Sequence, residues 1–185
     1  MIESIRIRRA TPADARGIAH VHVESWRSTY AGILPDRVMV QMSVEQKASS
    51  WRRQLETHAK TQGVLVAELP DGGVAGFASC GRTINALSGF ASEIYMLYVL
   101  PDWQEQGLGR GLLCTSLQLL SKSGSDTALV WVLAGNPSRF FYEAMGARRV
   151  GERDEVLWGV TLHELAYGWR SLKPLPPPCR GRATR

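Results

Sequence analysis

A glycine-rich turn between a strand and a helix is the segment with the clearest capacity for chemistry. Gly107 and Gly109 follow an apolar run that ends at Leu100, and apolar residues then recur with helical spacing over 108–121. The first N–H groups of such a helix lack intrahelical partners and carry the positive end of its dipole, so they can hold a diphosphate. Arg110 adds a positive charge beside them. The competing interpretation is that both glycines only permit close packing of the helix on a sheet.

Neither of the two common nucleotide-binding fingerprints fits this turn. The dinucleotide-binding motif requires a third glycine where Leu112 stands, and the P-loop requires a Gly-Lys-Ser/Thr sequence that does not follow here. A phosphate site at this turn would therefore rely on backbone N–H groups and on the absence of glycine side chains.

Two motifs resemble those of the GNAT superfamily of N-acetyltransferases. Gln104-x-x-Gly107-x-Gly109, after a strand that ends Leu-Tyr-Val-x-Pro, resembles the acyl-CoA signature of the superfamily. The segment 136–146, Asn-Pro-Ser-Arg-Phe-Phe-Tyr-Glu-Ala-Met-Gly, is similar to its second motif. The order of strands and helices agrees over residues 4–168, and the pattern is similar to that of many bacterial members. The resemblance implies an enzyme that uses acetyl-CoA.

The resemblance also implies which residues bind the cofactor. Two parallel strands, 93–100 and 127–133, would splay apart so that the pantetheine arm bonds to backbone groups of Leu97 and Val99. Asn136 would contact CoA, cap the following helix, or do both, although many relatives have one more residue between this asparagine and the tyrosine of the motif. Backbone N–H groups from 106 to 110 would hold the pyrophosphate. The predicted cofactor-binding residues are Leu97, Val99, Gln104, Gln106, Gly107, Leu108, Gly109, Arg110 and Asn136.

Tyr142 and Glu93 are the catalytic residues that the resemblance implies. Tyr142 matches a tyrosine that lies near the CoA sulfur in many relatives, where a phenol can protonate the departing thiolate; otherwise it packs beside Phe140 and Phe141. Glu93 is the candidate base for the acceptor ammonium, directly or through water. Some relatives carry their catalytic glutamate two residues later, where this chain has Tyr95. Glu93 could instead fix the acceptor amine, or be a strand-edge charge without catalytic duty.

Trp26 and Tyr30 are the predicted acceptor-binding residues. They are four residues apart, so they share one face near the end of the first helix. In the superfamily, the region between the first two helices shapes the acceptor pocket, and aromatic faces suit a cationic amine. The alternative is that both residues belong to the core between helix and sheet. The loop 82–92 is a candidate lid.

Metal and thiol chemistry are not expected. His20 and His22 point to different helix faces, and the other two histidines have no ligand at suitable spacing, so we expect no metal. Cys114 lies on an apolar helix face and is expected to be a small buried apolar residue. The sequence has three cysteines, Cys80, Cys114 and Cys179, which are far apart and form no CxxC motif. This spacing favours a reducing, cytoplasmic compartment.

The elements that position these residues follow from periodicity and from turn signals. Strands are expected at 5–8, 63–69, 74–80, 93–100 and 127–133, with two more within 147–167, and helices at 12–30, 43–55, 108–121 and 136–146. Hairpins together with one βαβ crossover predict an α/β or α+β domain with a mixed sheet. The resemblance implies a mostly antiparallel central sheet with helices on both faces and two splayed parallel strands.

Composition places the chain among ordinary globular proteins. It has 185 residues, of which 44% are hydrophobic and 21% charged, and it has no apolar run of membrane-spanning length. The N-terminal residues contain no apolar core, so we expect no secretory signal. The net charge is +5, but the segment 171–185 supplies four basic residues and no acidic one, which leaves 18 basic against 17 acidic residues elsewhere. A nearly neutral body does not suit nucleic acid. We therefore expect a domain at 1–170 and a flexible, basic, proline-rich tail at 171–185.

The sequence thus predicts an N-acetyltransferase that moves the acetyl group of acetyl-CoA to a primary amine by direct attack in a ternary complex. The acceptor would be a small molecule or a peptide, with no nucleic-acid or membrane partner, and the chain would be a monomer or a homodimer. Two alternatives stay open. The chain could be a CoA-binding regulatory module without catalysis, or an interaction protein that docks through its basic tail.

Overall fold

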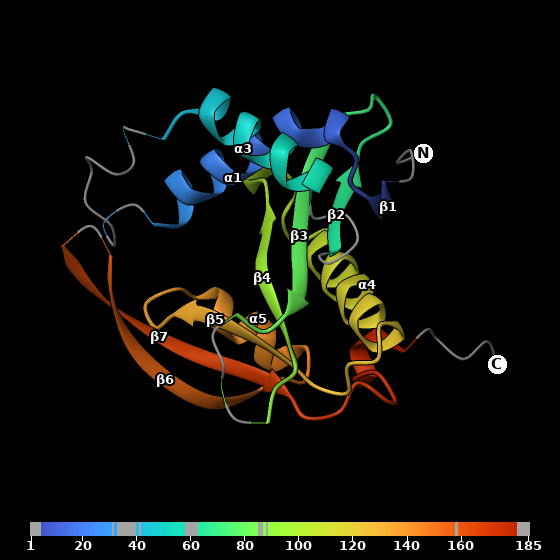
Figure 1. Cartoon of the computed structure of the whole chain (residues 1–185), viewed down its shortest axis with the longest axis vertical. Helices are drawn as coiled ribbons and strands as arrows, with labels where there is room; N and C mark the ends of the chain where they lie inside the picture. Colours follow the sequence, from blue (N-terminus) through green and yellow to red (C-terminus); the bar gives the residue numbers. More distant parts are fainter. Residues whose placement is uncertain are drawn as a thin grey trace. The chain divides into compact units, whose positions relative to one another are not determined.

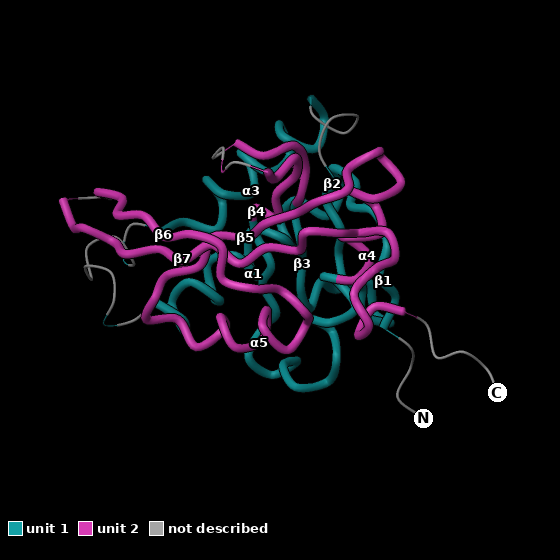
Figure 2. Tube along the Cα trace, turned by 90° about the horizontal axis from the view of Figure 1, so that it is seen from below, with its two compact units in different colours: residues 1–79, 96–113 teal, residues 80–95, 114–185 magenta. Residues whose placement is uncertain are grey.

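The computed structural model describes residues 5–30, 32, 40, 42–57, 63–84, 87, 89–157 and 159–180. The chain forms two compact units, shown in two colours in Figure 2. The first consists of residues 1–79 and 96–113, and the second of residues 80–95 and 114–185. Three elements run from one unit into the other: strand β3 (Val74–Arg82), strand β4 (Ser92–Val99) and helix α4 (Leu108–Lys122).

The first unit combines strands with a pair of helices that lie side by side (Figure 1). Its remaining elements are β1 (Arg6–Arg9), the 3-10 turn η1 (Pro12–Asp14), α1 (Ala15–Thr29), α3 (Val44–Thr57), β2 (Gly63–Glu68) and the 3-10 turn η2 (Pro101–Trp103). β1 pairs antiparallel with β2, with Arg6 opposite Glu68. β2 returns into β3 through a tight turn in which the Leu69 N–H donates to the Gly73 carbonyl.

Pro12, Asp14 and Arg8 fix the start of α1. Pro12 opens η1, and Asp14 accepts hydrogen bonds from the Thr11 backbone N–H at 2.7 Å and from Arg8 at 2.8 Å. Arg8 also contacts Glu68 at 2.7 Å, so it joins the helix start to strand β2. Its hydrogen bonds hold the pKa of Asp14 below the ordinary value.

Two apolar clusters form the core of the first unit. One joins α1 and α3 to the strands and includes Ile18, Trp51 and Phe77. The other includes Leu65 together with Leu112 from α4. Gly111 permits this second contact, because a Cβ at that position would lie only 2.5 Å from Cδ1 of Ile7. Along β2, side chains alternate between the two clusters: Val64 and Val66 enter the first, and Leu65 and Ala67 enter the second.

The second unit contains β5 (Ala128–Leu133), α5 (Ser138–Ala144), β6 (Arg148–Leu157) and β7 (Val160–Trp169) together with the first half of β4. β4 pairs parallel with β5, and β7 pairs antiparallel with both β5 and β6. Charged pairs connect the two strands of the β6–β7 hairpin, such as Arg153 with Glu164 at 2.6 Å. Ile94, Leu129 and Trp169 are among the buried apolar residues of this unit.

The predicted order of strands and helices is confirmed, and so is the fold class. Neighbouring strands follow the order β1-β2-β3-β4-β5-β7-β6, a seven-stranded mixed sheet with one parallel pair, β4 and β5. Among the helices that the structure describes, none has the length and apolar character needed to cross a bilayer.

Described residues of the segment after β7 pack against the rest of the second unit. Leu172 is 1% exposed, and its N–H donates to the Asp126 carbonyl at 2.8 Å. Pro176 is buried and lies against Gly146, the residue two positions after α5. A short 3-10 turn, η3 (Pro177–Cys179), then brings Cys179 to α4.

A disulfide joins Cys114 of α4 to Cys179, across 65 residues of chain. The prediction that Cys114 is an unpaired apolar residue is therefore wrong. The prediction failed because it treated 171–185 as detached from the domain, so that no partner was expected near α4. With this pair formed, the spacing of the cysteines no longer supports a reducing compartment.

Candidate active site

The turn between β4 and α4 has the backbone geometry that its glycines predict. Gly107 has a φ of 83°, and the preceding Glu105 has a φ of 60°. Among the described residues, no atom comes within 4 Å of the position that a Cβ at Gly107 would occupy. Close packing therefore does not explain this glycine, whereas its left-handed backbone does. The glycine that packing requires is Gly111, one helical turn further on.

Side chains of the turn bond back to its own backbone. Nε2 of Gln104 donates to the Val99 carbonyl at 3.0 Å, and Nε2 of Gln106 donates to the Asp102 carbonyl at 3.1 Å. Leu108 is 8% exposed and anchors the first turn of α4 in the apolar core. Gln104, Gln106, Gly107 and Arg110 are exposed. The turn therefore presents the N-terminal end of α4 at the surface of the first unit, where N–H groups and the helix dipole favour an anion.

The ladder between β4 and β5 is short. It comprises Ser92, Glu93 and Ile94 opposite Ala128, Leu129 and Val130. β4 continues to Val99 and β5 to Leu133, and both strands lie wholly within the described residues. The resemblance places the pantetheine arm along the backbone of β4 beyond this ladder. Leu97 and Val99, predicted to bond to pantetheine, lie in this continuation of β4.

Glu93 is buried in the second unit and holds the loop that follows β3. It is 4% exposed, and its Oε2 accepts hydrogen bonds from the Ile84 N–H at 3.0 Å and from Oγ1 of Thr83 at 3.3 Å. These bonds orient the carboxylate and fix the start of the loop predicted as a lid, parts of which lie outside the described residues. Its catalytic role stays a prediction.

Tyr95 occupies the position at which some superfamily members carry their glutamate. Its hydroxyl donates to the Arg82 carbonyl, and its ring covers Gly81, where a Cβ would lie 2.6 Å from the phenol oxygen. Burial first, and the nearby Glu93 second, raise the pKa of Tyr95 to about 12. Tyr95 is therefore protonated near neutral pH and cannot replace a carboxylate as base.

Tyr142 and Asn136 lie at α5 in the second unit, and both are buried. Tyr142 is 6% exposed, and its ring meets those of Phe141 and Trp169 edge to face, with centroids 5.2 and 6.4 Å away. Asn136 is 5% exposed, and its Oδ1 accepts a hydrogen bond from the Ser138 N–H at 2.9 Å. Asn136 thus bonds to the N–H of the first residue of α5, as a capping side chain can, and its contact with CoA stays a prediction.

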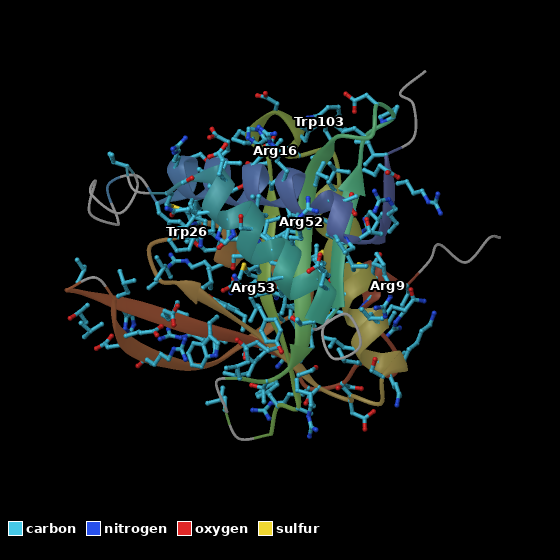
Figure 3. The ribbon with its side chains drawn as sticks, turned by 45° about the horizontal axis from the view of Figure 1, so that its top comes forward. Arg9, Arg16, Trp26, Arg52, Arg53 and Trp103 are labelled. Atoms are coloured by element: carbon cyan, nitrogen blue, oxygen red, sulfur yellow. A yellow bond between two sulfur atoms is a disulfide. The ribbon has the colours of Figure 1, made fainter. Side chains whose placement is uncertain are left out.

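Trp26 and Tyr30 form the half-buried end of an aromatic cluster in the first unit. Their ring centroids are 5.0 Å apart, and Nε1 of Trp26 donates to the Tyr98 hydroxyl at 3.0 Å. His22 stacks on Tyr98, with centroids 5.6 Å apart. Figure 3 labels Trp26 near the end of α1 and Arg16 near its start. The cluster is defined as His22, Trp26, Tyr30, Trp51, Phe77 and Tyr98.

Comparison with known proteins decides the family. A family model described as an acetyltransferase (GNAT) domain matches residues 60–146. A relative from Bacillus subtilis, the uncharacterized N-acetyltransferase YuaI, is 36% identical over 92% of this chain and 96% of its own length. The chain belongs to the GNAT family of acetyltransferases. It is an N-acetyltransferase, as its motifs predict.

Solved structures show the same fold for this GNAT protein. The paia N-acetyltransferase of Thermoplasma acidophilum, in complex with coenzyme A, has a TM-score of 0.61 and 22% identity, over 88% of this chain and 98% of its own. The structure of yncA from Salmonella typhimurium with its cofactor acetyl-CoA has a TM-score of 0.67 and 19% identity, over 99% and 98% of the two chains. Both neighbours were therefore solved with the class of cofactor that the turn motif predicts here.

Two residues that contact Trp26, His22 and Tyr98, are not among the predicted site residues. His22 was considered only as a metal ligand, although its spacing of four residues from Trp26 places both on one helix face. Tyr98 was read only as part of a strand, although alternation separates its face from that of Leu97 and Val99. Within the described ranges, no group of three or more His, Cys, Asp and Glu side chains is arranged to hold a metal ion.

A charged groove in the first unit is lined by none of the predicted site residues of this acetyltransferase. Its volume is about 480 Å³, and it opens between the start of α1 and the exposed face of α3. Figure 3 labels three of its arginines. The lining residues are Arg16, Glu45, Ala48, Ser49, Arg52, Arg53 and Glu56. Substitution of one of these arginines can serve as a control for substitution of Arg110 in the turn before α4.

Proposed function

We propose that this GNAT enzyme transfers the acetyl group of acetyl-CoA to a primary amine by direct attack in a ternary complex. The observation that carries the proposal is the turn before α4, where Gly107 adopts a left-handed backbone in open space at a helix N-terminus. Acetyl-CoA supplies a thioester whose carbonyl carbon is attacked by the neutral amine, with CoA thiolate as leaving group. We retain 1–170 as the catalytic domain, with 171–185 appended to it.

Backbone groups would bind the cofactor. N–H groups from 106 to 110, together with the Arg110 guanidinium, would hold the pyrophosphate at the surface of the first unit. Leu97 and Val99 would bond to the pantetheine amides, and an N–H near Val99 would polarise the thioester carbonyl. Most of these contacts use backbone groups, so they depend little on which side chains the turn carries.

Side chains of the second unit would perform the proton transfers. Glu93 would assist deprotonation of the acceptor ammonium through a water molecule, because two groups of the 83–84 loop already hold its Oε2. Tyr142 would protonate the departing thiolate. A covalent route through cysteine is not supported, because Cys80 is fully buried and Cys114 is bonded to Cys179.

The acceptor would bind at Trp26 and Tyr30. Both rings are half-buried, and a π face attracts a cationic or polar amine while the ring edge packs in the core. Small-molecule and peptide amines share this chemistry, so both classes belong in a substrate screen.

A calorimetric titration with acetyl-CoA, followed by an amine screen that monitors free-thiol release, tests the proposal. Saturable binding at one site per chain and amine-dependent thiol release support it. Gly107→Val should weaken acetyl-CoA binding about 10- to 100-fold, because a β-branched residue is strained at a φ of 83°.

Gly72→Val is the matched control. Gly72 has a φ of 85° and also has open space around it, but it lies in the β2–β3 turn. It should show similar strain and unchanged acetyl-CoA affinity. Equal affinity losses in both variants would contradict a cofactor role for the turn. Binding without turnover of any amine would indicate a CoA-binding module instead of an enzyme.

A further inference from the structure

Three buried polar atoms of the first unit have no hydrogen-bond partner among the described residues. They are Nε2 of His22, Oγ of Ser25 and Oγ of Ser79. The three residues are 3%, 2% and 1% exposed. Buried polar groups in folded proteins are nearly always hydrogen-bonded to protein or to ordered water, because an unsatisfied group destabilises the fold.

Two contacts show how α1 is aligned with β3. Near the start of α1, a Cβ at Gly17 would lie 2.7 Å from Cγ2 of Val74 on β3. Further along both elements, the rings of His22 and Phe77 have centroids 5.9 Å apart. The helix and the strand therefore advance in the same direction along their shared surface.

The next step along each element brings the two serines to this surface. Ser25 lies three residues beyond His22, on the same face of α1. Ser79 lies two residues beyond Phe77, on the same face of β3. By this spacing, an imidazole and two hydroxyls lie on the facing surfaces of α1 and β3.

The tautomer of His22 makes its Nε2 a hydrogen-bond donor. Nε1 of Trp51 donates to Nδ1 of His22 at 3.4 Å, which assigns the ring hydrogen of the neutral imidazole to Nε2. Burial, with a smaller effect of the Lys47 charge, lowers the pKa of His22 to about 4, so the ring is neutral near pH 7. One N–H donor and two hydroxyls match the roughly three hydrogen bonds that a buried water makes.

We propose that His22, Ser25 and Ser79 bind ordered water between α1 and β3, and that this water positions the acceptor amine beside Trp26. Trp26 follows Ser25 directly, and its ring centroid lies 5.6 Å from that of His22. A water that accepts from Nε2 of His22 and donates to both hydroxyls keeps one lone pair, which accepts an amine N–H. The inference rests on the proposed function, since it takes Trp26 as the acceptor end. The three residues are positioning residues, because they act through the water.

Stability measurements without substrate test the water itself. Ser25→Ala and Ser79→Ala each remove one hydroxyl, and the control Ser49→Ala removes an exposed hydroxyl from α3. If the hydroxyls hold water, both buried variants lower the urea midpoint of unfolding, whereas the control leaves it nearly unchanged. A midpoint that stays the same or rises in both buried variants overturns the water site, because removal of a truly unpartnered polar atom relieves its burial cost.

Kinetics test the positioning role. Ser79→Ala should raise the amine KM about tenfold, the equivalent of one lost hydrogen bond, and leave the acetyl-CoA KM unchanged. His22→Gln keeps an N–H donor and should retain more amine affinity than His22→Leu. Wild-type amine KM in Ser79→Ala, despite a lowered midpoint, overturns the positioning role while the water stands. Failure of the wild type to acetylate any amine overturns that role together with the proposed function, and the stability result then decides the water alone.

Discussion

The turn before α4 and the helix α5 are both predicted to handle the cofactor, but they are built in different ways. The turn is exposed, and two of its residues, Glu105 and Gly107, adopt left-handed backbone conformations. At α5, Asn136 and Tyr142 are buried, and their neighbours fix their side chains. A substitution in the turn therefore acts through the backbone, whereas one at α5 acts through packing and through a single functional group. We therefore expect substitutions in the turn to weaken acetyl-CoA binding, and substitutions at α5 to lower the rate of acetyl transfer.

The largest expected effect concerns the support of α5 by the C-terminal segment. Cys114→Ser removes a crosslink that spans 65 residues, which corresponds to about 4 kcal/mol in the free energy of unfolding on a chain-entropy estimate. Urea unfolding of the oxidised wild type, with and without a reducing agent, measures this loss. Pro176 should also lose its position against Gly146, so hydrogen exchange after α5 should accelerate, whereas exchange in the turn should not.

The variant itself provides the control for this experiment. A reducing agent should destabilise the wild type and leave Cys114→Ser unchanged. Equal unfolding midpoints for oxidised and reduced wild type would show that the crosslink does not support the segment.

Tyr142→Phe separates chemistry from binding. Loss of the proposed proton donor should lower kcat about 100-fold, while acetyl-CoA affinity measured by calorimetry stays the same. Tyr167→Phe is a matched control, since Tyr167 is another buried tyrosine of the second unit and lies outside both motifs. A similar loss of kcat in both variants would mean that the effect is structural.

The difference between the turn and α5 also explains what the sequence could predict. Gly107 was predictable, because the demand for a positive φ is local and glycine meets it most easily. The bonds of Glu93 to Thr83 and Ile84 were not, because they depend on how the end of β3 meets β4. The burial of Tyr142 against Trp169 likewise requires the packing of α5 on β7.

Long-range pairs were the hardest to predict. Three cysteines allow three pairings or none, and spacing alone does not choose among them. The bond between Cys114 and Cys179 requires the chain after β7 to return to α4, which its prolines did not suggest. The burial of His22 was also missed, because a histidine in an amphipathic helix pattern reads as a surface residue until its aromatic neighbours are known.

Arg110→Ala is the smallest expected effect and tests whether the turn binds mainly through its backbone. Arg110 is exposed, and an exposed charge contributes at most about 1 kcal/mol, so acetyl-CoA affinity should fall no more than about fivefold and less at high salt. Arg53→Ala, in the charged groove on α3, is the control and should leave affinity unchanged (Figure 3). A loss of 100-fold or more for Arg110→Ala would transfer the main role in phosphate binding from the helix N–H groups to this side chain. The contrast between a backbone-built turn and a side-chain-built α5 would then no longer hold.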